Sequence, residues 1–331
     1  GRDEAKLRTV RDGITGAGDV PLIHADASAP ASLEAMARRT SVVLTTVGPY
    51  QKYGEPLVAA CAATATDYVD LCGEPAWMAE MIERYQAAAA QSGARIVFSC
   101  GFDSIPFDLG VWFLQQHAIA TTGAPLNHVS GRVRKMKGGF SGGTAASLLA
   151  TLEAAQKDRS LISRLADPFL LAGGFRGPRQ PRGDKARHDA DFQAWAAPFI
   201  MATINTKNVH RTNFLLGWPF GRDFTYDEMQ LTGDGSKGRS RARGAETQTH
   251  IQNALLAFPP TRALLKQFAL PKPGEGPSKE ERETGLFDIG FAGRAADGSV
   301  LRAGVTGDRD PGYGSTSKMI AEAALCLLEE V

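Results

Sequence analysis

Hydrophobic runs of strand length alternate with helix-like stretches over the first third of the chain. The runs predict strands at residues 20–26, 42–47, 67–71 and 94–100. The stretches between them predict helices at 32–39, at 55–65 and from residue 75 onward. The last of these has one apolar stripe, formed by Trp77, Met78, Met81, Ile82 and Tyr85. Strands that alternate with helices indicate right-handed crossovers and a parallel sheet covered on both faces.

The pattern changes after residue 120. Residues 128–138 alternate like an antiparallel strand with one side in solvent, whereas 173–190 contain mainly Gly, Pro and Arg and predict a loop. Three further strands are predicted, at 222–233, 286–295 and 299–307. The dipeptide Asp297-Gly298 between the last two is a favoured hairpin turn. An amphipathic helix at 317–329 follows.

These patterns predict an α/β chain with two domains. Residues 1–120 are expected to form a Rossmann-type, doubly wound parallel sheet, and 121–310 an α+β domain for substrate binding or dimerisation. The helix within 311–331 is expected to fold back onto the first domain. A homodimer is compatible with this organisation.

A Rossmann domain normally has a glycine-rich turn between its first strand and first helix. "GITGAGDV" (13–20) leads into a strand and is interpreted as a surface turn. "GGFSGGT" (138–144) follows a strand and opens a helix, but it lies outside the alternating array, so we assign it to backbone crowding or the substrate side. Because Gly1-Arg2 is followed directly by a predicted helix at 4–10, we expect the first strand and its turn to lie upstream.

Composition excludes several classes of function. The net charge of +1 argues against a nucleic-acid partner, since phosphate binding needs a strongly basic surface. No run of about 18 apolar residues indicates a transmembrane segment, and the first residues lack the apolar core of a secretory signal. The four cysteines and six histidines are scattered, which favours reduced core thiols and no metal site. The expected location is the cytoplasm, with peripheral attachment to a membrane left open.

Seven sequence blocks occur in a characteristic order. They are "GR…KL" at the start, "TTVGPYQKYGEPLV", "YVDLCGE", "CGFDSIPFDLG", "KGGFSGGT", "LPKPGEGPS" and "GDRDPGYGSTSKM". With these blocks nearly the whole chain resembles the saccharopine dehydrogenase-like family, and within it the trans-acting enoyl reductase branch. The resemblance implies an NADPH-dependent reductase of double bonds in acyl chains carried by lipid-making polyketide synthases or their carrier proteins. The chain differs in lacking the first strand and a "GATGFTG"-type turn, and in stopping at Val331 where relatives continue.

Two residues are candidates for the adenosine end of the cofactor. Arg2 follows the inferred second strand, where an arginine can pair with the 2′-phosphate of NADP. Asp26 ends the next predicted strand, where its carboxylate can accept a hydrogen bond from the adenine amino group. Alternatively, Arg2 is an exposed arginine and Asp26 caps the following helix.

The end of the strand at 42–47 is the first candidate for the nicotinamide end. Thr46, Val47, Gly48 and Pro49 are expected at the carboxyl edge of the sheet, where Gly48 lets the backbone approach a pyrophosphate and a ribose. In the following segment, Tyr50 is a candidate proton donor, and Lys52 could lower its pKa or hold an anion. Alternatively, Gly48-Pro49 only terminates a strand, and both following side chains are ordinary surface residues.

The strand at 94–100 ends in a second corner, "CGFDSIP". Cys100 and Gly101 are assigned to cofactor contact, and Ser104 is a further candidate donor. Asp103 receives an orienting role, because a carboxyl group donates a proton poorly unless burial raises its pKa. Alternatively, Asp103 or Ser104 caps the helix that begins near Pro106.

Other parts of the chain supply weaker candidates. Substrate contacts are expected from Lys137, Asn205 and Lys207, and residues 310–316 are expected to fold onto the nucleotide domain. The basic stretch 233–246 is interpreted as a flexible, Gly-rich loop, either merely solvated or steering an acidic carrier protein.

Two other functions stay open from the sequence. A saccharopine-type amine–carbonyl oxidoreductase would need an arginine pair for its substrate's carboxylates, and Arg132 and Arg134 alternate on one predicted strand. The second alternative is a non-catalytic, lipid-associated protein that keeps the fold.

Overall fold

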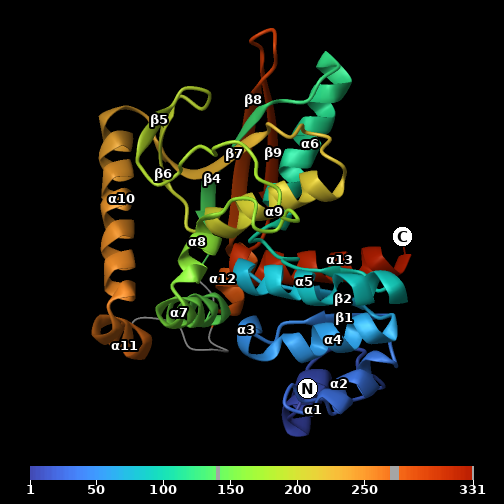
Figure 1. Cartoon of the computed structure of the whole chain (residues 1–331). Helices are drawn as coiled ribbons and strands as arrows, with labels where there is room; N and C mark the ends of the chain where they lie inside the picture. The colour runs from blue at the N-terminus through green and yellow to red at the C-terminus, as the bar shows by residue number, and fades with distance from the viewer. Residues whose placement is uncertain (139–141, 269–275, 330–331) are drawn as a thin grey trace.

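The computed structural model describes residues 1–138, 142–268 and 276–329, which form two adjoining units (Figure 1). The first unit contains a three-stranded parallel sheet, and the second contains a six-stranded mixed sheet in the described residues. The sequence blocks "GGFSGGT" (138–144) and "LPKPGEGPS" (270–278) fall partly on residues 139–141 and 269–275, which lie outside the described residues.

The first unit is a doubly wound α/β sheet of Rossmann type. Its strands β1 (Val42–Thr45), β2 (Asp67–Asp70) and β3 (Ile96–Val97) lie side by side in that order and run parallel. Helices α4 (Glu55–Thr64) and α5 (Pro75–Ser92) connect them. Since both crossovers step in the same direction across the sheet, right-handed connections place these two helices on one face.

The opposite face of this sheet is covered by α13 (Thr316–Glu329), the last helix of the chain. Ile320 and Ala324 of α13 share a buried cluster with Val69 of β2 and with Cys100. Three shorter helices complete the unit, namely α1 (Glu4–Asp12), α2 (Pro30–Ala37) and α3 (Tyr50–Tyr53).

Two predicted strands are shorter or absent. Residues 20–26 form no strand, although Gly1 N donates to Ile23 O (3.2 Å) and Ala25 N donates to Gly1 O (3.0 Å), as in a single rung of a parallel ladder. The strand predicted at 94–100 is limited to Ile96–Val97. The backbone turns out of the sheet at Ser99, which has a φ of 63° and donates its amide to a carboxylate of β2.

The second unit is built on one mixed sheet. Its strands are β4 (His128–Lys137), β5 (Arg187–Asp189), β6 (Ala194–Pro198), β7 (Thr225–Gly233), β8 (Leu286–Arg294) and β9 (Val300–Gly307). Their order is β5-β6-β7-β4-β8-β9. The strand predicted at 128–138 is confirmed, and it pairs antiparallel with β8, but its predicted solvent side is wrong, because β4 is a central strand that also pairs parallel with β7. Residues 129–133 are buried, and only the end of β4 is exposed.

Helices surround this sheet and link it to the first unit. They are α6 (Ile105–Thr122), α7 (Gly142–Lys157), α8 (Ser160–Ala166), α9 (Ala202–Leu215), α10 (Gly235–Ala257), α11 (Pro259–Phe268) and α12 (Lys279–Thr284). A short π-helix, η1 (Pro311–Ser315), precedes α13. Helix α6 packs on the second sheet, and a Cβ at Gly110 would lie only 2.3 Å from the Phe291 ring. The predicted boundary near residue 120 stays a prediction, and this contact favours a boundary before α6.

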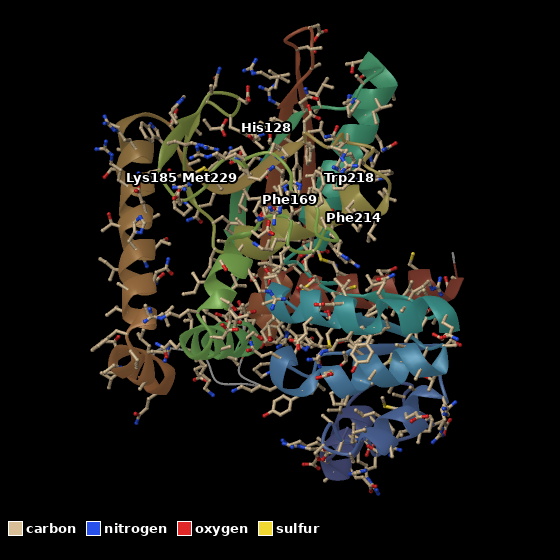
Figure 2. The ribbon with its side chains drawn as sticks, in the orientation of Figure 1. His128, Phe169, Lys185, Phe214, Trp218 and Met229 are labelled. Carbon is tan, nitrogen blue, oxygen red and sulfur yellow. The ribbon has the colours of Figure 1, made fainter. Side chains whose placement is uncertain are left out.

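Aromatic side chains fix the C-terminal end of α9 (Figure 2). The rings of Phe214 and Trp218 lie 5.6 Å apart, and the ring of Phe169 lies 4.5 Å from that of His210. Offset and edge-to-face pairs of this kind add to the stabilisation from burial. Helix α9 is thereby held in place along a face that also carries several polar side chains.

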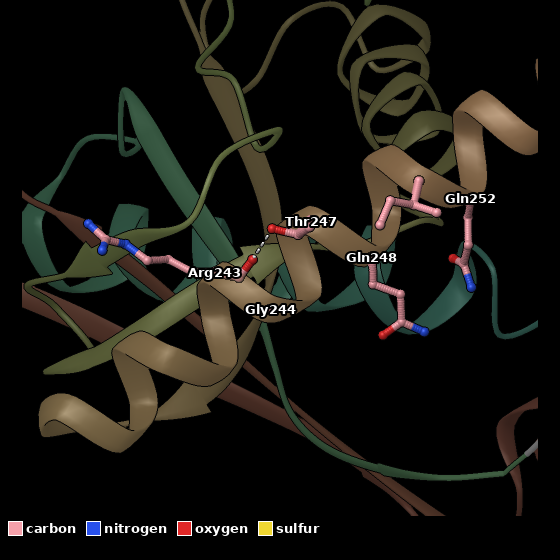
Figure 3. Close-up of a pocket in the computed structure, with 6 residues that line it drawn as sticks. Arg243, Gly244, Thr247, Gln248 and Gln252 are labelled. Atoms are coloured by element: carbon pink, nitrogen blue, oxygen red, sulfur yellow. Dashed lines mark hydrogen bonds between the residues drawn. The ribbon is translucent and has the colours of Figure 1, made fainter.

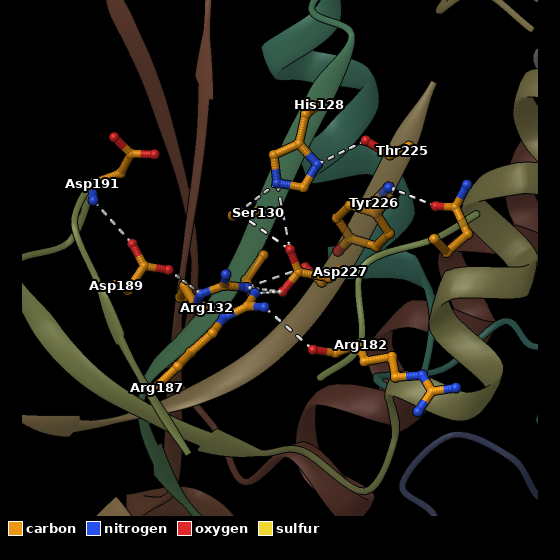
Figure 4. Close-up of polar contacts among 12 residues, drawn as sticks. His128, Ser130, Arg132, Arg182, Arg187, Asp189, Asp191, Thr225, Tyr226 and Asp227 are labelled. Atoms are coloured by element: carbon orange, nitrogen blue, oxygen red, sulfur yellow. Dashed lines mark hydrogen bonds and ion pairs between the residues drawn. The ribbon is translucent and has the colours of Figure 1, made fainter. Parts of the chain in front are cut away.

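A buried ion-pair network joins β4, β5 and β7 (Figure 4). Arg132 Nε lies 2.6 Å from Asp189 Oδ2, and Arg132 Nη1 lies 2.9 Å from Asp227 Oδ2. Arg187 also binds Asp227, at 2.6 Å. Arg134 instead pairs with Asp288 at the surface. The expectation of an arginine pair for substrate carboxylates is therefore wrong, because both guanidinium groups bind carboxylates of the chain itself.

The basic stretch 233–246 is not a flexible loop, because most of it forms the first half of α10. A Cβ at Gly238 would lie 2.1 Å from Gly233 O, and Ala242 one turn later is fully buried. These small residues let the helix lie directly against the end of β7, where Thr232 Oγ1 donates to Gly238 O. The glycine at 238 thus serves close contact and not flexibility.

Two glycine-to-alanine substitutions in α10 test this explanation. Gly238→Ala should lower the free energy of unfolding by about 1–3 kcal/mol, because the new methyl group meets backbone. Gly244→Ala is the matched control, since no atom lies within 4 Å of its added Cβ, and it should stabilise by roughly 0.5–1 kcal/mol through helix propensity. Urea denaturation of both variants measures the difference, and equal effects would contradict the close contact.

Candidate active site

The carboxyl end of β1 leads into an exposed corner. Thr46, Val47 and Gly48 follow the strand and are exposed, with 56% of Val47 accessible to solvent. Gly48 and Pro49 are joined by a cis peptide bond, and α3 begins at the next residue. The segment predicted to face a cofactor is therefore accessible at the edge of the parallel sheet.

At two glycine positions on this edge, the chain itself leaves enough space for a larger side chain. No atom lies within 4 Å of an ideal Cβ at Gly73, which follows β2, and a Cβ at Gly48 would make only ordinary contact with Tyr50, at 3.5 Å. At Gly54, by contrast, a Cβ would lie 2.6 Å from Trp77. The backbone at the ends of β1 and β2 is thus open to the close approach of a ligand.

Tyr50 is buried beneath this corner, with 5% of its surface exposed. Its hydroxyl donates to Thr45 O (3.3 Å) and accepts from Leu71 N (3.1 Å), so it links the ends of β1 and β2. Burial raises the pKa of Tyr50 well above its ordinary value. The hydroxyl of Tyr50 thus has a structural role, and its predicted role as a proton donor stays a prediction. Lys52 is exposed on α3 and lies 3.9 Å from Glu153 of α7.

Asp70, which the sequence analysis did not single out, binds the ends of two neighbouring strands together. It is fully buried and accepts hydrogen bonds from Tyr68 Oη (2.8 Å), Cys72 N (2.9 Å) and Ser99 N (2.8 Å). Burial raises its pKa to about 7. The sequence could have indicated Asp70, because it lies near the end of the predicted strand 67–71. It is therefore at the same sheet edge as the candidate residues that follow the strands at 42–47 and 94–100.

Glu74 connects the β1 corner to the second unit. It is buried, and its carboxylate accepts from the amides of Tyr50 and Gln51, each at 2.9 Å. Ser147 Oγ of α7 donates to the same carboxylate at 2.6 Å. One acidic side chain therefore fixes the start of α3 and holds α7 against it.

The second corner packs closely against α13. Cys100 is buried, its amide donates to Asp70 O (2.7 Å), and burial raises the pKa of its thiol to about 12. A Cβ at Gly101 would lie 3.0 Å from Leu71 and 3.2 Å from Thr316. Phe102 N donates to Thr316 Oγ1 at 3.0 Å. Thr316, at the end of the segment 310–316, thus lies against this corner, and the close packing alone is a reason for glycine at position 101.

Asp103 and Ser104 lie at the start of α6 but have different surroundings. Asp103 is half-buried, its carboxylate makes no hydrogen bond within the described part of the chain, and burial raises its pKa to about 7. Ser104 is buried, donates to Asp103 O and accepts from Asn208 Nδ2 of α9 at 2.5 Å. Neither side chain caps α6. The corner thus presents an unusually weak acid on a backbone fixed by α9.

The second unit contributes buried polar groups from α9. Asn205 Nδ2 donates to Glu228 Oε2 at 2.8 Å. Lys207 Nζ donates only to Thr203 O (3.0 Å) among the described residues, and burial lowers its pKa to about 8. Lys137 lies apart, exposed and 3.1 Å from Thr284 Oγ1. The three predicted substrate contacts therefore do not form one cluster.

The two adenosine-end candidates lie together. Arg2 is exposed, and its charge contributes to a lowered pKa of Asp26, although hydrogen bonds from Ser28 are the main cause. Asp26 Oδ1 accepts from both Ser28 N and Ser28 Oγ at 2.8 Å, shortly before α2. Neither residue is joined to the Gly48 corner by a hydrogen bond or ion pair in the described residues.

Another hollow on the surface has few side chains that could take part in a reaction. A surface hollow of about 600 Å³ runs along one side of α10 and is lined by Arg243, Gly244, Thr247, Gln248, Ile251 and Gln252 (Figure 3). It has one titratable side chain and lies away from the strand ends. In the described residues no group of three or more His, Cys, Asp or Glu side chains could hold a metal ion. None of the described helices is long and apolar enough to cross a membrane.

The raised pKa of Asp70 predicts a pH dependence of stability. An unfolded aspartate ionises near its ordinary value of 3.8, whereas folded Asp70 keeps its proton up to about pH 7. Between these values the free energy of unfolding should fall with rising pH, by up to about 1.4 kcal/mol per unit from this group. Asp70→Asn cannot ionise and should remove that slope.

Urea denaturation between pH 4 and 8 measures the slope. Asp297→Asn is the control, because Asp297 is an exposed turn residue whose pKa is lowered, so its contribution falls below this window. Parallel curves for wild type and Asp70→Asn would show that Asp70 is ionised in the folded chain.

The amino-acid sequence is similar to those of several mycobacterial proteins. It is 38% identical over 344 residues to a trans-acting enoyl reductase of Mycobacterium ulcerans, covering 99% of this chain and 81% of the relative. The trans-acting enoyl reductase of Mycobacterium tuberculosis H37Rv is 37% identical over 345 residues with the same coverage. A second protein of that organism, from the same family, is 41% identical over 345 residues, again covering 99% and 81%.

Solved structures with a similar arrangement are more distant. Saccharopine dehydrogenase (L-Glu forming) from Saccharomyces cerevisiae has a TM-score of 0.47 and 12% identity, over 99% of this chain and 84% of that one. An amine dehydrogenase from Mycobacterium smegmatis has a TM-score of 0.41 and 12% identity, over 92% and 75%. No protein-family model matches the chain. On the sequence identity to its mycobacterial relatives over nearly its whole length, the chain belongs to the trans-acting enoyl reductase family.

Proposed function

We propose that this chain reduces the carbon–carbon double bond of an enoyl thioester with NADPH, on acyl chains carried by a partner synthase or carrier protein. Membership of the trans-acting enoyl reductase family supports an oxidoreductase of this kind. The observation that carries the proposal is the edge of the parallel sheet. Two open glycine positions there follow the ends of neighbouring strands, and the segment after the next strand contains the half-buried Asp103.

The residues at this edge fit a nicotinamide dinucleotide. Thr46, Val47 and Gly48 are exposed at the end of β1, and the open Gly73 follows β2. Backbone without a Cβ allows the close approach that a pyrophosphate and ribose need. Pro49, Cys100 and Gly101 complete the proposed contact surface. When bound, the cofactor supplies a hydride to the substrate.

The chain itself must supply a proton to the α-carbon of the substrate. Asp103 is suited to this task, because burial raises its pKa to about 7 and its carboxylate has no competing hydrogen bond in the described residues. The sequence analysis gave Asp103 only an orienting role because an aspartate with an ordinary pKa is a poor proton donor. With its pKa raised by burial, Asp103 becomes a candidate donor. Ser104 holds this corner through Asn208 and thus positions Asp103. Tyr50 and Lys52 remain candidates, but the buried Tyr50 hydroxyl would have to leave two backbone partners.

The enoyl thioester is favoured over an amino-acid adduct by the state of the arginines. A substrate with free carboxylates needs unpaired guanidinium groups, and both Arg132 and Arg134 are engaged with aspartates. A thioester carbonyl needs no such pair. We also place the 2′-phosphate of NADPH at Arg2, which is exposed beside Asp26.

The role of Arg2 is tested by cofactor affinity. Arg2→Ala should weaken NADPH binding about ten- to hundredfold, as expected for loss of about 1.5–3 kcal/mol from a charged hydrogen bond, and should leave NADH binding unchanged. Arg8→Ala removes another exposed arginine and serves as the control. Titration calorimetry measures the NADPH and NADH affinities of all three proteins. A wild type that binds both cofactors equally would refute the assignment.

The reaction and the role of Asp103 are tested together by NADPH oxidation with a crotonyl thioester. Wild type should consume NADPH, and its turnover should fall as the pH rises through about 7, because Asp103 loses the proton that it donates. Asp103→Asn should lower kcat by about 10²–10⁴-fold, with NADPH affinity kept. It should also lose the pH dependence near 7.

Asp108→Asn is the matched control for this test. Asp108 also has a pKa raised by burial to about 7, but its carboxylate accepts from Thr212 at 2.6 Å. This variant should keep the wild-type pH profile. If both variants change the profile alike, Asp103 is not the donor, and if wild type leaves NADPH unoxidised with the thioester, the proposed reaction is wrong.

A further inference from the structure

A basic cleft lies where α12, η1 and the first turn of α13 meet. Its volume is about 450 Å³. It is lined by Lys279, Arg282, Glu283, Arg309, Tyr313, Gly314, Ser317 and Lys318. Figure 1 shows α12 beside the N-terminal end of α13, at the end of the first unit where the parallel strands finish. The cleft is not part of the corner described above, although it borders it.

Two arginines of the cleft keep donors for a ligand. Lys279 lies 3.9 Å from Glu283, and Lys318 lies 2.7 Å from the exposed Asp308, so the two lysines are largely balanced. Arg282 uses Nη1 for Pro277 O (2.9 Å), which leaves its other donors available. The Arg309 side chain makes no hydrogen bond, and no ion pair within 4 Å, among the described residues. Asp308, whose pKa is lowered mainly by its hydrogen bond with Lys318, is also affected by the charge of Arg309.

Backbone amides at this place are already occupied. Asp310 is fully buried and accepts from Tyr313 N (2.9 Å) and Gly314 N (2.8 Å). An anion in the cleft must therefore be held by side chains. Two guanidinium groups with free, planar donors suit the oxygens of a phosphate better than a single carboxylate.

The cleft is close to the proposed chemistry. Thr316 follows η1 directly and accepts the amide of Phe102, the residue before Asp103. Gly314 and Ser317, on either side of Thr316, both line the cleft. A ligand with its phosphate in the cleft can thus extend toward the corner that holds Asp103.

We propose that the cleft binds the phosphate of a phosphopantetheine arm, and that it thereby positions the thioester at the Asp103 corner. This inference rests on the proposed function, because it names the handle of the same substrate. An enoyl thioester has no charge near its double bond. Between the thioester and the carrier protein, the pantetheine arm has one anionic group, which is the phosphate that joins the arm to the protein. Arg309 and Arg282 therefore bind this phosphate.

Binding of 4′-phosphopantetheine and of pantetheine, measured by titration calorimetry, tests the proposal without any turnover. Wild type should bind phosphopantetheine about tenfold more tightly than pantetheine, and this preference should shrink at high salt. Arg309→Ala should abolish the preference, and Arg309→Lys should keep part of it, because charge remains without the planar donors. Arg302→Ala is the control, since this exposed arginine of β9 lies outside the cleft.

Three results would overturn the proposal. They are equal binding of the two probes by wild type, an unchanged preference in Arg309→Ala, and inorganic phosphate that binds as tightly as phosphopantetheine, which would make the cleft a general anion site. NADPH oxidation with crotonyl-pantetheine and crotonyl-phosphopantetheine separates this proposal from the proposed function. Turnover of both with equal KM rejects the cleft but keeps the reaction, whereas turnover of neither, with the binding preference intact, keeps the cleft and rejects the reaction.

Discussion

The carboxylate of Asp70 is the contact on which the candidate site depends. It is buried, pairs with no cation among the described residues, and accepts hydrogen bonds from one hydroxyl and two backbone amides, those of Tyr68, Cys72 and Ser99. A buried carboxyl group without such donors would be strongly destabilising. Because two of the donors belong to the segments that leave β2 and β3, the same bonds that satisfy Asp70 fix both exits of the chain from the sheet.

Neighbouring polar contacts extend this arrangement into the second unit. Glu74 joins the start of α3 to Ser147 of α7, and Thr316 joins η1 to the amide of Phe102. Ser104 is held by Asn208 of α9. The corners of the parallel sheet are therefore positioned by helices from the other unit, so the site is a property of the interface and not of the first sheet alone.

The sequence predicts the regular parts of this structure well and the polar contacts poorly. Periodic apolar positions correctly predict α5 and α13 and the strand at β1, because the periodicity follows from which side of the element is buried. The same rule fails for α10. The sequence predicted a flexible loop there, whereas the small residues Gly238 and Ala242 allow the helix to pack closely against the end of β7. It also fails for Arg132, whose partners come from β5 and β7 and share no local pattern with it.

For the candidate site, the position of the residues could be predicted but not their surroundings. Strand ends select Gly48 and Asp103 because ligands of α/β proteins gather there. Whether a side chain is free depends on distant residues. Tyr50 is engaged by Thr45 and Leu71, whereas Asp103 is left without a partner in the described residues, and no spacing in the sequence distinguishes them.

The placement of α13 has a consequence for the order of folding during synthesis. Ile320 and Ala324 cover Val69 of β2, yet they come after every strand of the second sheet. A growing chain that has finished β1, β2 and β3 must therefore leave one face of that sheet bare while residues 128–307 emerge from the ribosome. The first unit begins early and is completed last, and in the meantime its uncovered apolar face is a surface for chaperones.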